Sequence, residues 1–556
     1  MSNEPDVLVI GGGPAGASVA TLVKKYTPGA RVVVCEQEAY PRHHIGESFV
    51  ADINRLLADM DVYEKIKKAG FIRKRGSTFI WGRDRTPWTI EFSNLGAIPG
   101  FSDGAGYDSS YTWHVQRHVY DKILLDHARE MGAEVLQPAS AEIQFDDANE
   151  VQGVKLSDGR VLHPRYVIDA TGQHNQISRR MKTREYDPEL RNIAIYGYYQ
   201  GAELNPALSG NWEDTRIAVI TVPDGWIWYI PVAKDLVSVG VVTSRDALTR
   251  RGNASVRDYY ESTVQGCVEV APLLKNATRI VYGGSDTDIH TIKDYCYSVS
   301  KLYGRGWALC GDASGFVDPI LSIGCYLAHS GGSRLAYTLN TLLSGAPVDE
   351  ALAWRAYEEQ LRYSLSAFRR MTYMFYAFND GKESWWWEAK KILRERALPQ
   401  SVDGPASFLA LATGYGINRP VTHEAISDFG VNIFDSFTQN LIQPGTIKAQ
   451  VDLGRGRVFR RTTGFHAEPW VVPIQGTGKL HPVMRVTFDG RGEDSPLPAR
   501  LFLPSTHWRF VDALHERTAE QALGLLPRDE AELLRPQLPS FLTGLVNLGV
   551  MSSSAS

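Results

Sequence analysis

The feature that most constrains the fold lies near the N-terminus, where a short apolar segment runs directly into a glycine-rich turn. Residues 6–10 have the composition of a buried strand, and Gly11, Gly13 and Gly16 follow at GxGxxG spacing before a helical stretch at residues 17–26. A second apolar strand at residues 31–35 ends at Glu36, whose carboxylate can accept ribose hydroxyls. This order predicts a dinucleotide-binding βαβ unit with the pyrophosphate at the helix N-terminus.

Two later segments favour FAD over NAD as the dinucleotide. Residues 166–169 form an apolar strand that leads to Gly172, and residues 307–310 form another that leads to Asp312. In an α/β sheet such strand ends gather around one cofactor crevice. The sequence shows no second strand–GxGxxG–helix unit for a nicotinamide. We therefore expect the flavin to be reduced by NAD(P)H that binds transiently, or elsewhere.

Composition excludes several functional classes. The formal net charge of -4 argues against nucleic acid as a partner. No apolar run reaches the ~18 residues of a membrane span, and a strand that begins near residue 6 leaves no room for a signal peptide. The five cysteines lack CxxC spacing, so neither a zinc site nor a disulfide framework is expected. These features predict a cytoplasmic protein.

A Trp-x-Trp-x-Ile-Pro segment at residues 226–231 suggests what surrounds the cofactor. In an extended segment alternate side chains share a face, so Trp226, Trp228 and Ile230 project the same way. Beside a flavin such a wall would hold an organic substrate away while a small oxidant passes. Plain core packing of the aromatic pair is the alternative.

Several motifs together resemble those of the flavin-dependent halogenases, from about residue 6 to residue 375. They are His44-Ile45-Gly46-Glu47-Ser48, Lys74 within residues 73–79, Trp113-His114-Val115-Gln116-Arg117, the Trp226–Pro231 segment and the loop at residues 311–324. The resemblance implies an α/β fold: a Rossmann-like, glutathione-reductase-type FAD domain, an inserted β-sheet substrate domain and a C-terminal, mainly helical region. It also implies that FADH₂ and O₂ oxidise chloride or bromide to hypohalous acid, which halogenates an aromatic ring.

The same resemblance assigns the site residues. Lys74 is the catalytic lysine, whose ammonium polarises hypohalous acid or whose amine carries halogen, although its place among Lys65, Lys67, Lys68, Arg73 and Arg75 also fits a solvated charged face. Glu47 would position Lys74 or relay a proton. The backbone of the segment Ser322-Ile323-Gly324 would bind halide as an anion nest, unless it is an ordinary loop that opens a helix. Trp226, Trp228 and Phe368 would gate the substrate. The expected FAD contacts are Gly11, Gly13, Ala15, Gly16, Glu36, Ser48, Arg117, Gly172, Asp312 and Pro319.

One departure from the family pattern narrows the substrate. Halogenases of free tryptophan carry a glutamate beside the serine of the halide loop, where this chain has Leu321. The resemblance then favours an electron-rich phenolic or pyrrolic ring, free or tethered to a carrier protein. It also implies a separate NAD(P)H-dependent flavin reductase as partner.

The expected organisation is a core at residues 1–380, whose substrate sheet spans about 75–115 and 190–290, and a partly helical region at 381–556 that covers the substrate cavity. Trp385-Trp386-Trp387 would serve helix packing or the cavity, and the basic residues 455–461 a carrier contact or, more simply, a solvated loop. Three other functions fit parts of the pattern. They are an aromatic hydroxylase, a flavoprotein like geranylgeranyl reductase, and a flavin-binding scaffold without turnover.

Overall fold

The cofactor sheet is built from the strands that the N-terminal motif predicts. The computed structural model describes residues 4–81, 85–97, 106–250, 255–377, 457–474, 476–490 and 500–555, and within them a six-stranded sheet has the order β19-β20-β10-β1-β2-β6. All neighbours except β19 and β20 run parallel. The strands are β1 (Val7–Ile10), β2 (Val32–Cys35), β6 (Glu134–Leu136), β10 (Tyr166–Asp169), β19 (Tyr303–Gly304) and β20 (Trp307–Leu309).

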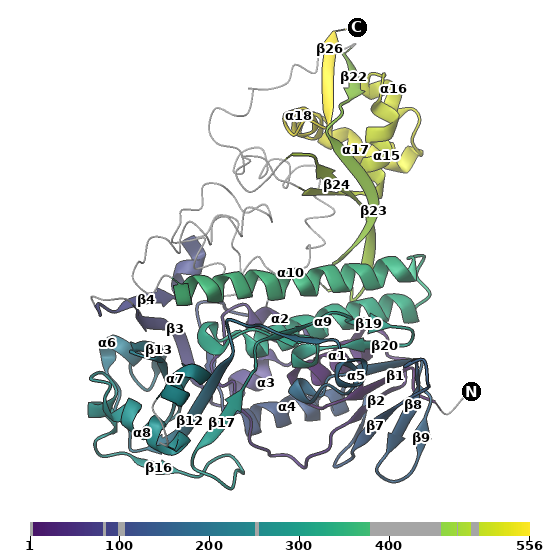
Figure 1. Ribbon diagram of the computed structural model, residues 1–556. Helices are drawn as coiled ribbons and strands as arrows, with labels where there is room; N and C mark the ends of the chain where they lie inside the picture. Colours follow the sequence, from purple (N-terminus) through teal and green to yellow (C-terminus); the bar gives the residue numbers. More distant parts are fainter. Residues whose placement is uncertain are drawn as a thin grey trace.

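The central strands are buried along their whole length because helices cover the sheet (Figure 1). Ile10 pairs with both Cys35 and Asp169, so the carboxyl ends of β1, β2 and β10 lie at one edge. The chain leaves β1 toward β2 on one side, and β10 lies on the other, which makes this edge a topological switch point. The helices around this sheet are α1 (Pro14–Tyr26), α2 (Ile53–Asp59), α3 (Tyr63–Lys68), α4 (Arg117–Glu130), α5 (Gln176–Met181) and α9 (Gly324–Leu343).

A second, nine-stranded sheet lies beside the cofactor sheet and comes from two separate stretches of the described chain. Its main path is β16-β12-β15-β14-β13-β3-β4, with β17 on β12 and β5 on β3. These strands are β3 (Ile72–Ile80), β4 (Trp88–Glu91), β5 (Thr112–His114), β12 (Asn192–Gln200), β13 (Asp214–Val222), β14 (Gly225–Ala233), β15 (Leu236–Ser244), β16 (Thr278–Ile280) and β17 (His290–Lys293).

The period-two pattern of β14 divides its side chains between two hydrophobic clusters. Trp226, Trp228 and Ile230 belong to the cluster shared with the cofactor domain. Ile227 and Tyr229 point to the opposite face, into a cluster to which α8 (Val256–Gln265) contributes. The alternation predicted from the sequence is therefore present, and it turns the tryptophan pair toward the cofactor side. The remaining small elements here are α6 (Pro206–Ser209), α7 (Arg245–Arg250), β7 (Ala141–Phe145), β8 (Val151–Leu156), β9 (Val161–Leu162), β11 (Arg184–Tyr186), β18 (Tyr297–Val299) and β21 (Gly315–Phe316).

The long helix α10 (Glu350–Ala377) lies between this core and the C-terminal elements (Figure 1). Arg485 of the C-terminal elements forms an ion pair with Glu359 of α10 at 2.7 Å, and this pair joins the two parts. The Arg485 guanidinium also lies 3.6 Å from the centre of the Trp470 ring, within the C-terminal elements. The C-terminal elements have a hydrophobic cluster of their own and combine helices with strands. They are β22 (Arg457–Arg461), β23 (Phe465–Pro473), β24 (Leu480–Phe488), β25 (Arg500–Pro504), β26 (Met551–Ala555), α15 (Ser505–Leu514), α16 (Ala519–Leu523), α17 (Arg528–Leu534) and α18 (Leu538–Asn547).

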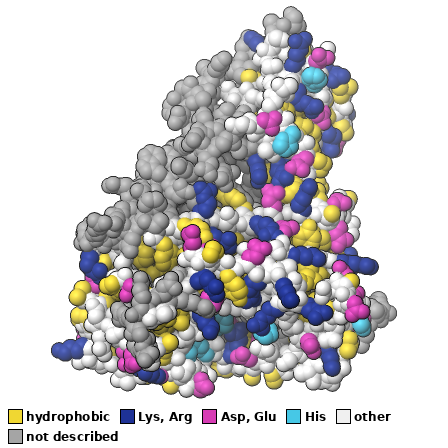
Figure 2. Space-filling model, in the orientation of Figure 1, with side chains coloured by type: hydrophobic (Ala, Val, Ile, Leu, Met, Phe, Trp, Pro, Cys, Tyr) yellow, Lys and Arg dark blue, Asp and Glu magenta, His cyan; other side chains and the backbone are white. Residues whose placement is uncertain are grey.

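The expectations for the tryptophan triplet and for the basic run at residues 455–461 fall wholly or partly outside the described residues. Trp385-Trp386-Trp387 and residues 455–456 of the basic run lie outside the described residues, whereas residues 457–461 form β22. Figure 2 shows Lys and Arg interspersed with Asp and Glu on the face in view. Of the helices in the described ranges, none is both long and apolar enough to cross a bilayer.

Candidate active site

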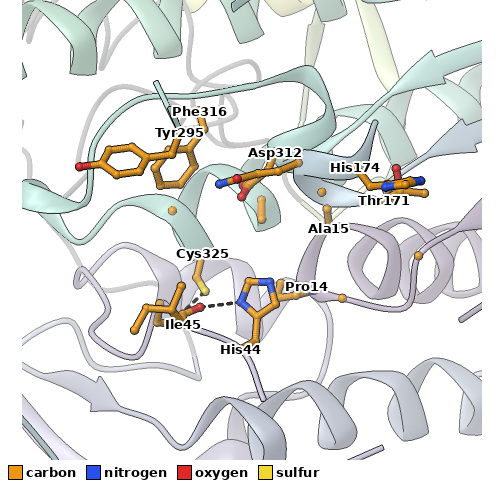
Figure 3. A pocket seen from close by; sticks show the side chains of 18 of the residues that line it. Pro14, Ala15, His44, Ile45, Thr171, His174, Tyr295, Asp312, Phe316 and Cys325 are labelled. Atoms are coloured by element: carbon orange, nitrogen blue, oxygen red, sulfur yellow. Dashed lines mark hydrogen bonds between the residues drawn. The ribbon is translucent and has the colours of Figure 1, made fainter. Parts of the chain in front are cut away.

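The carboxyl ends of β1, β2 and β10 open onto a cavity of about 1060 Å³. This is the position at which open α/β sheets bind dinucleotides, and the volume lies at the upper end of ligand pockets. Figure 3 shows Tyr295, Phe316 and Asp312 along one side of the cavity and His44 and Ile45 along the other. Of the expected FAD contacts, Gly16 is not among the lining residues. The others line the cavity: Gly11, Gly13, Ala15, Glu36, Ser48, Arg117, Gly172, Asp312 and Pro319.

The glycine loop fits FAD because two of its positions leave no room for a side chain. Gly11 has φ +110°, and a Cβ there would lie 2.3 Å from the Ala170 carbonyl oxygen. A Cβ on Gly16 would lie 1.9 Å from the Gly11 carbonyl oxygen, so only glycine lets α1 pack this closely on β1. The start of α1 therefore lies at the cavity wall, where the amides of a helix N-terminus suit a pyrophosphate.

Glu36 follows β2 and lines the same cavity. The Gly12 amide donates to Glu36 Oε2 at 2.8 Å, and the Glu38 amide donates to Oε1 at 2.9 Å. Tyr40 Oη also donates to Oε2 at 3.4 Å, so Oε1 keeps the lone pair that suits a ribose hydroxyl of FAD. The residues present therefore fit the cofactor that the sequence predicts.

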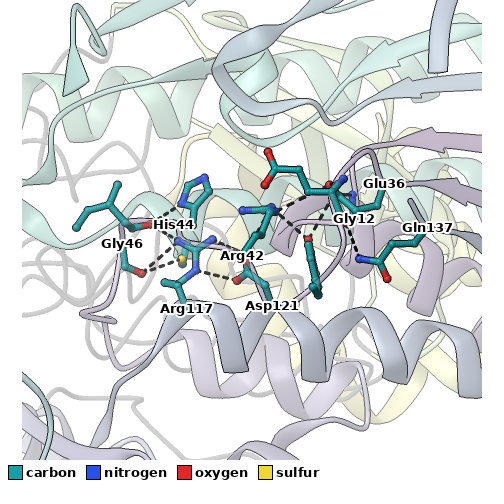
Figure 4. A network of polar contacts seen from close by, with 12 residues as sticks. Gly12, Glu36, Arg42, His44, Gly46, Arg117, Asp121 and Gln137 are labelled. Atoms are coloured by element: carbon teal, nitrogen blue, oxygen red, sulfur yellow. Dashed lines mark hydrogen bonds and ion pairs between the residues drawn. The ribbon is translucent and has the colours of Figure 1, made fainter. Parts of the chain in front are cut away.

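Arg117 fastens the segment at residues 44–48 against the cavity (Figure 4). It forms a bidentate ion pair with Asp121, at 2.8 and 2.9 Å, and donates to the backbone carbonyls of Ile45 and Gly46. Gly46 has φ +100°, and a Cβ there would lie 2.8 Å from Arg117 Nη1. Arg117 therefore shapes the wall of the flavin site as well as lining it.

Arg42 and Asp121 extend this network and were not among the residues predicted from the sequence. Arg42 lies 3.9 Å from Glu36 and 3.7 Å from Asp121, so it links the two ends of the cavity wall. The sequence signal for Asp121 is its i,i+4 spacing from Arg117 on a helix. For Arg42 we find no signal, because neither Glu36 nor Asp121 stands at a helical spacing from it.

The halide-binding residues expected from the sequence lie where a helix begins at the cavity. Ser322 adopts a left-handed conformation with φ +58°, and the 20-residue helix α9 starts at Gly324. The first amides of a helix lack intrahelical acceptors and carry positive partial charge. Ser322, Ile323 and Gly324 all line the cavity, and Ser322 Oγ donates to Ser48 Oγ at 3.3 Å. This helix end suits a small anion.

Lys74 is buried within β3, with none of its surface exposed. The strand alternates, so Arg73 and Arg75 turn outward, and Lys74 does not belong to a solvated charged face. Its Nζ donates to the Phe49 carbonyl at 2.6 Å and lies 5.4 Å from the centre of the Phe92 ring. Burial lowers the pKa of Lys74 to about 7. Ser48 lines the cavity and Phe49 follows it, so one peptide unit separates Lys74 from the cavity wall.

Glu47 and Lys74 have different contacts among the described residues. The Glu47 carboxyl lines the cavity near Tyr198 and Ser238 of the nine-stranded sheet, and both hydroxyls favour its ionised form. Burial raises the pKa of Glu47 to about 7. Its Oε2 has no hydrogen-bond partner within the described residues.

The tryptophan pair lines the cavity, but the third expected gating residue does not. Trp226 donates from Nε1 to the Tyr376 hydroxyl at 2.7 Å, and Trp228 donates to Ser238 Oγ at 3.2 Å. Both rings are therefore fixed by a hydrogen bond at their polar edge. Phe368 of α10 is fully buried and packs edge-on against Tyr326 of α9, with ring centres 6.1 Å apart. It is a core residue, because α10 turns this face toward α9.

Gly240→Ala is expected to displace Trp228 from the cavity wall without altering any lining residue. Gly240 pairs with Trp228 across β14 and β15, and a Cβ there would lie 2.1 Å from Trp228 Cζ2. We expect weaker FAD retention and altered tryptophan fluorescence. The double variant with Trp228→Phe, whose ring is smaller, should recover FAD retention. Unchanged fluorescence and retention in Gly240→Ala would contradict this packing.

Lys74→Met is expected to change how stability depends on pH. Because burial lowers the pKa of Lys74 to about 7, the unfolded chain binds this proton more tightly than the folded protein. The free energy of unfolding of the native protein therefore rises with pH from about 7 toward the ordinary lysine pKa, by about 5 kcal/mol over the whole interval. Denaturant titrations from about pH 6 to about pH 10 should show the stability advantage of Lys74→Met shrinking. A difference that is independent of pH would place the charged amine in solvent.

The geometry is that of a dinucleotide-binding enzyme whose cavity wall includes the start of a helix and which has a buried lysine beyond that wall. The family model for tryptophan halogenase matches residues 6–102 and 101–404. The chain belongs to the tryptophan halogenase family, and it is a flavin-dependent halogenase that uses FAD, O₂ and chloride or bromide.

Individual relatives agree with this assignment. The chain is 30% identical over 403 residues to a tryptophan 2-halogenase of Chondromyces crocatus, covering 71% of this chain and 72% of that protein. It is 30% identical over 335 residues to a 1H-pyrrole-2-carbonyl-[peptidyl-carrier protein] chlorinase of Pseudomonas fluorescens, covering 58% and 73%. The crystal structure of CmlS, a flavin-dependent halogenase, shares the fold with a TM-score of 0.66 at 22% identity, covering 100% of this chain and 97% of that one.

Proposed function

We propose that this halogenase places chlorine or bromine on an electron-rich phenolic or pyrrolic ring, using hypohalous acid that passes from the flavin cavity to Lys74. The observation that carries the proposal is the burial of Lys74 one peptide unit behind the cavity wall. A lysine without solvent contact is costly to fold, and its desolvation tunes the amine toward chemistry near neutral pH.

In this proposal FAD, the start of α9 and the tryptophan pair have separate roles. Bound FAD, once reduced, supplies with O₂ the two-electron oxidation that converts halide to hypohalous acid. The amides at the start of α9 hold the halide beside the flavin, because they offer unpaired donors and a positive helix end. Trp226 and Trp228 keep an organic ring out of the cavity, since both indoles are fixed by hydrogen bonds.

Lys74 acts in its ammonium form. One N–H is held by the Phe49 carbonyl, which leaves two donors for the oxygen of hypohalous acid. Such donation draws electrons from the halogen and makes it more electrophilic. Because burial lowers the pKa of Lys74 to about 7, the rate should fall as pH rises through this value. A rate that rises over the same interval would instead indicate a neutral amine that carries the halogen.

Leu321 supports an electron-rich substrate. It is buried beside Ser322 and brings no carboxylate to the halide loop. A phenol or pyrrole stabilises the cationic ring intermediate by its own heteroatom, so such a ring needs no carboxylate nearby. The pyrrole chlorinase among the relatives acts on a carrier-bound ring, whereas the Chondromyces relative is named for tryptophan. A separate NAD(P)H-dependent flavin reductase is the proposed partner.

The test is a reaction of the full chain with FAD, a flavin reductase, NADH and bromide. The acceptors are a panel of phenols and pyrroles, free and carrier-tethered, with free tryptophan as comparison. Mass spectra should show the bromine isotope doublet on a phenol or pyrrole and not on tryptophan. A doublet on tryptophan alone would overturn the substrate class. An oxygenated product without halogen would overturn the halogenation proposal in favour of a hydroxylase.

A further inference from the structure

A line of hydrogen-bonding side chains leads from the flavin cavity toward the protein surface. It starts at the Glu47 carboxyl, which lines the cavity, and continues to the buried Tyr198 hydroxyl of β12. Tyr198 Oη lies 3.1 Å from His43 Nε2. His43 is half-buried, and its ring stacks on that of His290, also half-buried, with centres 4.2 Å apart. The three polar groups are therefore consecutive.

Aromatic rings enclose this line on its flanks. Tyr196 lies beside His43 with ring centres 6.0 Å apart, and the Tyr282 ring packs against Tyr198 at 4.5 Å. Within the cavity the unpartnered Oε2 of Glu47 is the inner end of the line. Such an apolar sheath limits water at the middle of the line, so a proton would have to move along the side chains.

Burial and neighbouring charges shift the pKa values of Glu47 and His43, the two ends of this line. Burial raises the pKa of Glu47 to about 7, although Arg117 opposes this effect. Burial lowers the pKa of His43 to about 4, with further contributions from its charged and titratable neighbours His290, His118, Arg117 and Arg42. Tyr196 and Tyr282, which also face Glu47, have their pKa raised above the ordinary value by burial, so both phenols stay neutral. At neutral pH His43 is therefore neutral, and Glu47 is present in both forms.

We propose that His43, Tyr198 and Glu47 form the path by which a proton enters the flavin cavity during turnover. The need for it rests on the proposed function. One FADH₂, one O₂, one halide ion, one proton and one aromatic C–H give FAD, one carbon–halogen bond and two waters. One of the two electron pairs that reduce O₂ comes from FADH₂, and the other is released when the C–H bond is replaced by the carbon–halogen bond. The proton is the one reactant that none of these compounds supplies.

Each step of the path moves a proton between named atoms. Glu47 releases its carboxyl proton into the cavity and takes the Tyr198 hydroxyl proton in its place. Tyr198 takes the Nε2 proton of His43, and His43 takes a proton from water at Nδ1. No group along the line changes its net charge once the sequence is complete. Glu47 lines the cavity, and Tyr198 and His43 act through it.

The test measures proton exchange at Glu47 in the resting, FAD-loaded protein, without turnover. After dilution into D₂O, the carboxylic C=O band of Glu47, assigned by its loss in Glu47→Gln, shifts as its proton is replaced. Tyr198→Phe should slow this exchange by about 10²-fold. The matched control is Tyr282→Phe, which removes the same hydroxyl from the adjacent ring and should leave the rate unchanged.

Two further results decide the proposal independently of any substrate. His43→Ala should slow the exchange, and added imidazole should restore it. Bound-flavin absorbance confirms that each variant holds FAD. Equal exchange rates in the native protein, Tyr198→Phe and His43→Ala would overturn the path. Slow exchange in a protein that brominates nothing would keep the path and reject the proposed function, so the two failures are distinguishable.

Discussion

Lys74→Met is expected to lower the rate of halogenated product by about 10³-fold while reduced flavin is still oxidised. The cavity wall does not include Lys74, so the flavin, the halide loop and the tryptophan pair remain as they are. Methionine has a similar length and no charge, and it suits the buried position better than the amine does. The variant loses only the Nζ hydrogen-bond donor of Lys74, which lies behind the cavity wall. Product formation by mass spectrometry and flavin oxidation by absorbance measure the two processes separately.

Arg73→Met is the matched control for this variant. It removes a cation from the neighbouring position of the same strand, but Arg73 is exposed and stacks on Tyr111 rather than facing the core. We expect its rate of halogenation to lie within about twofold of the native rate, since exposed charges contribute little. Equal activity of Lys74→Met and Arg73→Met would reject the catalytic role of Lys74.

Gly16→Ala is expected to weaken FAD binding by about 10- to 100-fold. Its Cβ would lie 1.9 Å from the Gly11 carbonyl oxygen and 3.0 Å from Val9 Cγ1, and the nearer of these atoms belongs to the backbone. The helix α1 must move away from β1, and with it the amides that face the pyrophosphate. Overpacking of this kind costs about 1–3 kcal/mol. Quenching of flavin fluorescence on titration with the protein measures the affinity.

Gly29→Ala supplies the matched control in the same βαβ unit. A Cβ on Gly29 would have no heavy atom within 4 Å, so the same added methyl group is accommodated in open space. FAD affinity should be unchanged in this variant. If both substitutions left the affinity equal to the native value, the close approach of α1 to β1 would not be what holds the cofactor.

Local sequence determined the FAD-binding part of this protein. The strand ending at Ile10, the spacing of Gly11 and Gly16, and Glu36 at the end of the next strand are all short-range patterns. Each specifies its own geometry, because the tight turn and the close helix packing tolerate only glycine. The period of two in Trp226, Trp228 and Ile230 likewise fixed a shared face.

Only the tertiary structure decided which residues pack against Lys74, Glu47 and Phe368. Alternation along β3 sets Lys74 apart from Arg73 and Arg75, but only the approach of Phe49 and Phe92 buries it and lowers its pKa. Glu47 lies near Tyr198 and Ser238, which are distant in the chain, and Phe368 packs into the core rather than the cavity. The physical reason is that burial and hydrogen bonding depend on residues distant in the chain, and their positions follow from sheet register and helix packing, which no local pattern encodes.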